Sequence, residues 1–128
     1  MLSSVTYITE NYNNQYWSLE ENTGFDFEDY LHGIFSTLLK PYYKSGLRIT
    51  HTSKTRDDGI DIYISSPIEF SLMGINFSLN GKKTINTVIE CKSTKRDKIS
   101  LDKFARNIID SNEWDIDYFV LATNVEIT

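Results

Sequence analysis

Apolar side chains recur at helical spacing in one early segment of the chain and alternate with polar ones in several later segments. The helical segment carries Phe27, Tyr30, Leu31, Ile34, Phe35, Leu38 and Leu39. Because residues three and four apart lie on one side of a helix, this spacing predicts an amphipathic helix. Thr23 and Asp26 resemble a capping box at its start, and Pro41 closes it.

Four later segments have the composition and alternation of strands. They are residues 47–52, 59–65, 84–92 and 118–123. In the second of them Ile62 and Ile64 share one face and Asp61 lies on the other, because successive strand residues point to opposite faces. The last segment is almost continuously apolar, which is typical of a strand buried on both faces.

The remaining segments are less regular. Residues 3–22 are rich in Asn, Tyr and Ser, which favours an irregular lead-in. Residues 66–83 alternate on either side of Gly74, which predicts extra strands or a long hairpin arm, with a short helix as the alternative. Ser100 is a candidate N-cap for a second helix that ends near Asn112.

The order of these elements predicts the fold class. A helix, three strands that can meander, a second helix and a final strand give an α/β sandwich, in which helices flank a mixed central sheet. The 128 residues, 40% of them hydrophobic, suffice for one compact core. We therefore expect an arm over residues 1–22 and one domain over residues 23–128.

Composition and charge exclude several classes of protein. No segment approaches the roughly 18 apolar residues of a membrane span, and residues 1–10 lack the pattern of a signal peptide, so we expect a cytoplasmic protein without a membrane partner. The single cysteine, Cys91, excludes an internal disulfide and cysteine-based zinc sites. We expect it to be a small buried core residue.

Three charged residues lie where two of the predicted strands would meet. Glu90 and Lys92 are two apart and project from the same strand face, whereas Cys91 points into the opposite layer. If residues 59–65 and 84–92 pair antiparallel, the beginning of one lies beside the end of the other, which brings Asp61 near Glu90 and Lys92.

These three residues suit phosphodiester hydrolysis. That reaction needs hard oxygen ligands for Mg²⁺, an activated water and positive charge for the transition state. Asp61 and Glu90 supply the carboxylates, the backbone carbonyl of Cys91 is a further candidate ligand, and Lys92 orients the water or stabilises charge. Glu28, near the start of the first helix, is a candidate ligand, directly or through water, and for a second ion.

The chain resembles the PD-(D/E)xK nuclease superfamily, and within it most closely the Mrr-like restriction endonuclease domains. The matching elements, in order, are Gly24-Phe25-Asp26-Phe27-Glu28, Asp57-Asp58-Gly59-Ile60-Asp61-Ile62 and Val88-Ile89-Glu90-Cys91-Lys92, followed by a helix and an apolar strand. The resemblance covers about Gly24 to Thr123 and implies a restriction-endonuclease-like fold with an α-β-β-β-α-β core. The chain departs from the family's pattern at two places. Ile60 stands where the family's proline would be, and the loop over residues 66–83 is long.

By this resemblance, Asp61 and Glu90 bind Mg²⁺, for which Mn²⁺ can substitute, Lys92 is the catalytic lysine and Glu28 is the helix acid. It implies a magnesium-dependent DNA endonuclease of bacterial restriction or anti-phage defence. The expected partners are double-stranded DNA, a second copy of the chain in the active state, and further domains beyond Thr128.

Plainer interpretations stand beside these assignments. Glu90 and Lys92 on an edge strand would be solvated, and Glu28 would be a helix-dipole carboxylate. Asp57 and Asp58 compete with Asp61, but they precede Gly59 and fit a turn better. We expect the two histidines, His32 and His51, to be isolated from one another and not to be metal ligands.

The net charge of -5 argues against a nucleic-acid partner, because phosphate binding usually leaves a basic footprint. Candidate phosphate contacts follow the third predicted strand, namely Lys95, Arg96, Lys98, Lys103 and Arg106. A solvated loop and helix face explains them nearly as well. The alternative functions are a catalytically silent nuclease-like module for nucleic-acid binding or oligomerisation, and a nuclease of the same superfamily that acts on RNA or in repair.

Overall fold

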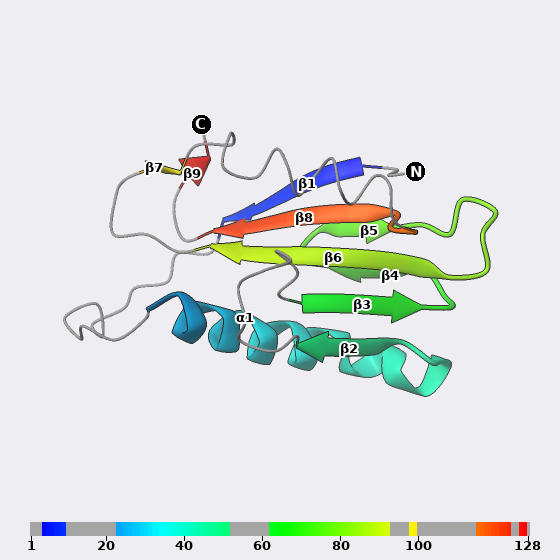
Figure 1. Cartoon of the computed structure of the whole chain (residues 1–128). Coiled ribbons are helices and arrows are strands. Elements are labelled where there is room, and N and C mark those ends of the chain that lie inside the picture. The colour runs from blue at the N-terminus through cyan, green and yellow to red at the C-terminus, as the bar shows by residue number, and fades with distance from the viewer. Residues whose placement is uncertain are drawn as a thin grey trace.

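A mixed five-stranded sheet forms the centre of the molecule, in the strand order β1-β8-β6-β3-β2 (Figure 1). Its strands are β1 (Ser4–Thr9), β8 (Tyr118–Thr123), β6 (Ile85–Lys92), β3 (Ile62–Ser66) and β2 (Arg48–His51). β8 runs parallel to both β1 and β6, whereas β3 is antiparallel to both β6 and β2. The expectation of an α/β protein with a mixed sheet is confirmed.

The computed structural model describes residues 4–9, 23–51, 62–92, 98–99, 115–123 and 126–127, and side chains within 6–8, 30–51, 62–91 and 115–123. The predicted second helix, residues 100–112, lies outside these ranges. Two short strands, β7 (Lys98–Ile99) and β9 (Glu126–Ile127), form a separate parallel pair. Among the described helices, none has the length and apolar character to cross a membrane.

One long helix, α1 (Thr23–Leu39), packs on one face of the sheet. Leu31, Phe35 and Leu39 are fully buried there and share a core with Ile62 and Ile89. Helical spacing predicted this packing, and the helix ends before Pro41 as expected. The chain then continues in a 3₁₀ helix, η2 (Lys40–Ser45), which the sequence did not predict, because proline fits the first turn of a helix as well as the residues after one.

The N-terminal segment is partly regular. The prediction of an irregular lead-in is wrong for β1, which pairs in parallel with β8 and places Ser4 opposite Tyr118 and Thr9 opposite Thr123. Four of its six residues are β-branched and one is Tyr7, a composition that favours a strand. The strand is short and its partner lies far along the chain, so local periodicity gave little signal.

The segment between β3 and β6 forms the expected hairpin. Its strands are β4 (Phe70–Leu72) and β5 (Ile75–Phe77), paired antiparallel. Met73 and Gly74 both have positive φ, 50° and 82°, as a two-residue hairpin turn of the favoured hand requires. Phe70 stacks on Phe77 with ring centroids 4.6 Å apart, and Phe77 meets Tyr118 of β8 edge-on at 5.0 Å. The hairpin therefore completes the core on the α1 side of the sheet.

The opposite face of the sheet is also buried at its centre. Val88 of β6 and both Phe119 and Leu121 of β8 are at most 1% exposed, although they alternate with residues that face α1. All six residues of β8 are buried, so the prediction of a strand covered on both faces is confirmed.

Candidate functional site

The two strands on which the expected site depends pair as predicted. β3 and β6 are antiparallel neighbours, with Ile62 opposite Ile89 and Ser66 opposite Ile85. The beginning of β3 therefore lies beside the end of β6. This arrangement is the one on which the expected meeting of Asp61, Glu90 and Lys92 depends.

Glu90 is buried in the middle of the sheet. Its residue is 9% exposed, and β6 lies between β3 and β8, with Glu90 in register with Leu121. The alternative of a solvated glutamate on an edge strand is therefore wrong. Burial of an ionised carboxylate costs free energy unless hydrogen bonds, a positive charge or a metal ion compensate for it.

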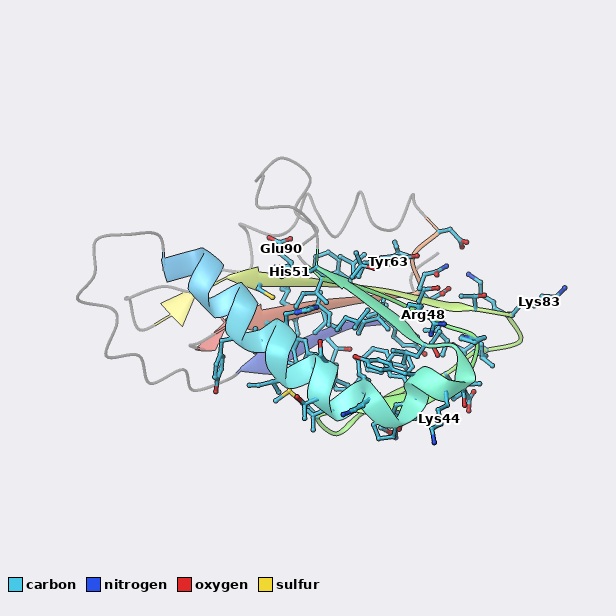
Figure 2. All side chains as sticks on the ribbon, turned by 90° about the horizontal axis from the view of Figure 1, so that it is seen from below. Lys44, Arg48, His51, Tyr63, Lys83 and Glu90 are labelled. Carbon is cyan, nitrogen blue, oxygen red and sulfur yellow. The ribbon has the colours of Figure 1, made fainter. Side chains whose placement is uncertain are left out.

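The side chains of Glu90 and Cys91 point to opposite faces of the sheet. Cys91 is 7% exposed and belongs to the core beneath α1, which confirms the expected buried cysteine. Glu90 lies on the side of the sheet away from α1 (Figure 2). Alternation along β6 explains both positions and places Lys92, the last residue of the strand, in the same phase as Glu90.

Several candidate residues fall where the structure gives no side chain. Asp61, Asp57, Asp58 and the basic residues Lys95, Arg96, Lys103 and Arg106 lie outside the described residues. The backbones of Lys92, Lys98 and Glu28 are described in β6, β7 and α1, but their side chains are not. Their roles stay predictions.

The position of α1 bears on Glu28. The helix packs against the face of β6 that carries Ile89 and Cys91, whereas Glu90 is on the other face. The backbone of Glu28, in the second turn of α1, therefore lies on the opposite side of the sheet from the Glu90 side chain. The role of Glu28 as a ligand stays a prediction.

Among the residues that the structure describes, no group of three or more His, Cys, Asp and Glu side chains is placed to hold a metal ion. The donor set proposed from the sequence includes Asp61, which is outside that part of the chain. Glu90 supplies the hard carboxylate oxygens that Mg²⁺ prefers, so this candidate ligand fits the ion.

A polar cluster at the other end of β6 was missed by the sequence reasoning. Lys82 Nζ lies 2.6 Å from Asp117 Oδ1 and 3.1 Å from Asp115 Oδ1. The other oxygen of Asp117 accepts a hydrogen bond from the backbone N–H of Asn86 at 2.8 Å, and the Asn86 side-chain oxygen accepts one from the Tyr63 hydroxyl at 3.0 Å. The cluster ties the starts of β6 and β8 together.

The charges of this cluster shift two pKa values. Hydrogen bonds to Asp117 and then to Asp115 raise the pKa of Lys82. Burial, and then the negative charges of Asp115 and Asp117, raise the pKa of Tyr63. The only local signal in the sequence was a pair of aspartates just before an apolar strand, and their partners lie about thirty positions away.

The two histidines are not isolated from each other. His32 of α1 and His51 of β2 stack with ring centroids 4.9 Å apart and an angle of 26° between the rings. The expectation that they lie apart is wrong, because the packing of α1 on the sheet brings together residues nineteen positions apart in the sequence. The stack joins the helix to the edge strand on the α1 side, away from Glu90.

No family model matches the chain, and no curated protein or solved structure is significantly similar to it.

Proposed function

We propose that this chain is a metal-dependent nuclease that hydrolyses phosphodiester bonds at a centre formed by Asp61, Glu90 and Lys92. The observation that carries the proposal is the burial of Glu90 on the central strand β6, two residues before Lys92 and beside the beginning of β3. A buried carboxylate next to a chain segment rich in charged residues is a frequent feature of functional sites.

Covalent geometry supports the inclusion of Asp61. Asp61 is bonded to Ile62 and Glu90 to Ile89, and Ile62 and Ile89 are partners in the antiparallel ladder. Adjacent Cα atoms are about 3.8 Å apart and partners about 5 Å, so the Asp61 and Glu90 Cα atoms are at most about 13 Å apart. Two carboxylate side chains can span that separation with an ion between them.

Each residue has a distinct role in the proposed reaction. Asp61 and Glu90 would hold the ion, with the Cys91 carbonyl as a further ligand, and Lys92 would orient the attacking water or stabilise the charge that develops on the phosphate. Mg²⁺, when bound, supplies positive charge and lowers the pKa of a coordinated water. The resemblance to PD-(D/E)xK nucleases, and to their Mrr-like members, rests on the sequence motifs that contain these residues and on the order of the predicted helices and strands.

The substrate is the second part of the proposal. We propose DNA, cut internally by the effector domain of a restriction or anti-phage defence protein. Because the net charge is -5, we expect other domains or a second subunit to supply much of the affinity for the phosphates. The same charge favours, as a second candidate, a catalytically silent nuclease-like module for oligomerisation.

Plasmid cleavage with Mg²⁺ or Mn²⁺ tests the proposal. Wild type should nick or linearise supercoiled DNA, and Asp61→Ala, Glu90→Gln and Lys92→Ala should each lower the rate by about 10²-fold or more. Lys83→Ala is the matched control, because Lys83 is an exposed lysine before β6 (Figure 2) and should leave the rate unchanged.

Two outcomes would contradict the proposal. Metal-dependent cutting that survives both Asp61→Ala and Lys92→Ala places the centre elsewhere. No cutting of DNA or RNA by the folded protein, in the longest natural form of the chain, favours the silent module.

A further inference from the structure

The helix α1 carries a second apolar row that the core leaves largely exposed. Tyr30, Ile34 and Leu38 are four residues apart and so lie on one side of the helix. Tyr30 is 37% and Leu38 46% exposed, whereas Ile34 is partly buried against the core. Most exposed apolar residues occur singly, so two exposed residues on either side of a partly buried one, along one helix, mark a surface that a partner can cover.

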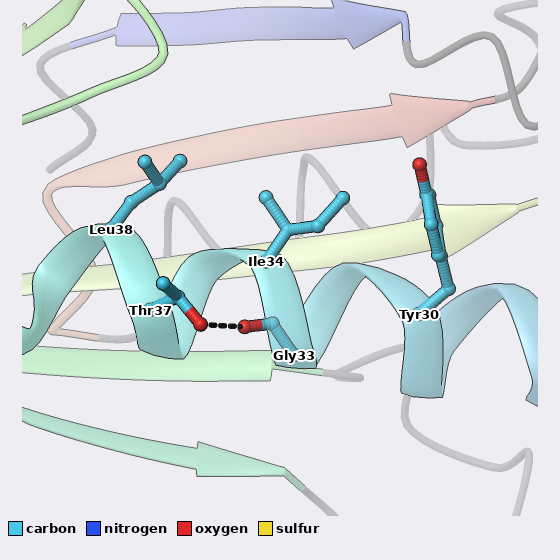
Figure 3. Close-up of a pocket in the computed structure, with 5 residues that line it drawn as sticks. All are labelled: Tyr30, Gly33, Ile34, Thr37 and Leu38. Carbon is cyan, nitrogen blue, oxygen red and sulfur yellow. Dashed lines mark hydrogen bonds between the residues drawn. The ribbon is translucent and has the colours of Figure 1, made fainter.

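This row borders an open groove of about 490 Å³ along α1. Tyr30, Gly33, Ile34, Thr37 and Leu38 line it, and the three large side chains point the same way from the helix (Figure 3). The Thr37 hydroxyl donates to the Gly33 carbonyl at 3.0 Å, so its polar group already has a partner. A Cβ built on Gly33 would meet nothing within 4 Å, which leaves room for the close approach of another helix.

α1 is acidic near its N-terminus and is followed by basic residues just beyond its C-terminus. Asp26, Glu28 and Asp29 lie in the first two turns of α1, and Lys40 and Lys44 follow its last residue in η2. A second α1 packed antiparallel on the first would bring the acidic end of each helix beside the basic end of the other. The two helix dipoles would also run in opposite directions, so the positive end of each would lie beside the negative end of the other.

The spacing of the apolar row also suits a twofold axis. Tyr30 and Leu38 are each four residues from Ile34, on either side of it. A twofold axis near Ile34 therefore sets Tyr30 beside Leu38 of the partner subunit, and one surface patch serves both copies. An unrelated apolar helix could also fill the groove, but a second α1 in this direction is the occupant whose side-chain charges the sequence itself makes complementary.

We propose that this groove is the interface of a symmetric dimer, in which α1 packs antiparallel on α1 of a second copy. The proposal is independent of the nuclease centre, because Glu90 lies on the other face of the sheet.

Sedimentation equilibrium over a wide range of protein concentration tests the dimer. Wild type should dimerise reversibly, and Leu38→Glu should raise the dissociation constant about 10- to 100-fold, because it buries a charge in an apolar contact. Met73→Glu is the matched control: Met73 is 40% exposed, lies in the β4–β5 turn and does not line the groove, so it should leave the constant unchanged. Circular dichroism and thermal unfolding check that each variant is folded.

A charge exchange tests the antiparallel direction. Asp29→Lys and Lys40→Glu should each weaken the homodimer, and a mixture of the two variants should form heterodimers in excess of half of all dimers, measured by native mass spectrometry. A wild type that stays monomeric at every concentration overturns the proposal and leaves the groove to a different protein. A dimer that Leu38→Glu does not weaken, or a mixture without preference for heterodimers, overturns it equally.

Discussion

Ile62 of β3 lies directly opposite Ile89 of β6, and both side chains are fully buried on the face of the sheet that α1 covers. In the sequence, Asp61 directly precedes Ile62, the first residue of β3, and Glu90 directly follows Ile89. Because alternate strand residues point to opposite faces, the apolar pair fixes the phase of β6 and directs Glu90 away from the helix. The packing of two isoleucines thus determines where the candidate acid stands.

A metal ion at this centre should stabilise the protein. A ligand that binds only the folded state adds about 2.7 kcal/mol at a concentration 100 times its dissociation constant, so Mg²⁺ or Mn²⁺ should raise the Tm of wild type. We expect Asp61→Asn and Glu90→Gln to lose most of this rise, and Glu69→Gln, a change at an exposed glutamate, to keep it. An equal rise in Tm for wild type and both site variants would show that the ion binds elsewhere.

Much of the sheet could be predicted from sequence because its strands keep strict phase. Ile62 and Ile64 were assigned to one face and Cys91 to the core, and all three are buried as expected. The antiparallel pairing of β3 with β6 also followed, since they are neighbours along the chain apart from one hairpin. Such features depend on local alternation and short connections, which the sequence shows directly.

Contacts between segments far apart in the sequence could not be predicted. The parallel pairing of β1 with β8, the stack of His32 on His51, and the ion pair of Lys82 with Asp117 all join residues at least nineteen positions apart. The periodicity of apolar residues in the sequence does not predict which polar residues come into contact after folding. Of the candidate centre, the strand pairing and the burial of Glu90 are observed, and the joint geometry with Asp61 and Lys92 stays a prediction.

Thr87 offers a stabilising substitution. Its residue is fully buried on β6, and its hydroxyl has no hydrogen-bond partner among the described residues. A buried hydroxyl without a partner costs roughly 1–3 kcal/mol, so Thr87→Val, which keeps the shape of the side chain, should raise the free energy of unfolding by about 1 kcal/mol. Thr87→Ser keeps the hydroxyl, removes a methyl group and should lower it. Urea unfolding measures both, and a Val variant less stable than wild type would contradict this assignment.

The Lys82 cluster should make the protein sensitive to alkali. The pKa values of Lys82 and Tyr63 are both raised in the folded state, so the folded protein holds these protons more tightly than the unfolded chain. Their contribution is present below the ordinary pKa values, near pH 10, and is lost as pH rises through the raised ones. We expect the free energy of unfolding to fall with pH above about 10, and Asp117→Asn to reduce this slope. A slope that is unchanged in Asp117→Asn would exclude the cluster as its source.

Gly46, which ends η2, should tolerate no side chain, for two separable reasons. Its φ of +105° is strained for any residue with a Cβ, and an added Cβ would lie 2.9 Å from Cγ of Pro67, whose ring cannot move aside freely. Gly74, with φ of +82°, shares the first problem, but a Cβ there meets nothing within 4 Å. Gly74→Ala should therefore cost about 1–2 kcal/mol of unfolding free energy and Gly46→Ala measurably more.

Pro67→Ala separates the two contributions at Gly46. In a double-mutant cycle, Gly46→Ala should cost less when Pro67 is already alanine, because the contact with the ring is gone and only the backbone strain remains. The remaining cost should approach that of Gly74→Ala. If Gly46→Ala costs the same with and without the proline ring, the close approach of Gly46 to Pro67 contributes nothing to the constraint, and the left-handed φ alone accounts for the glycine.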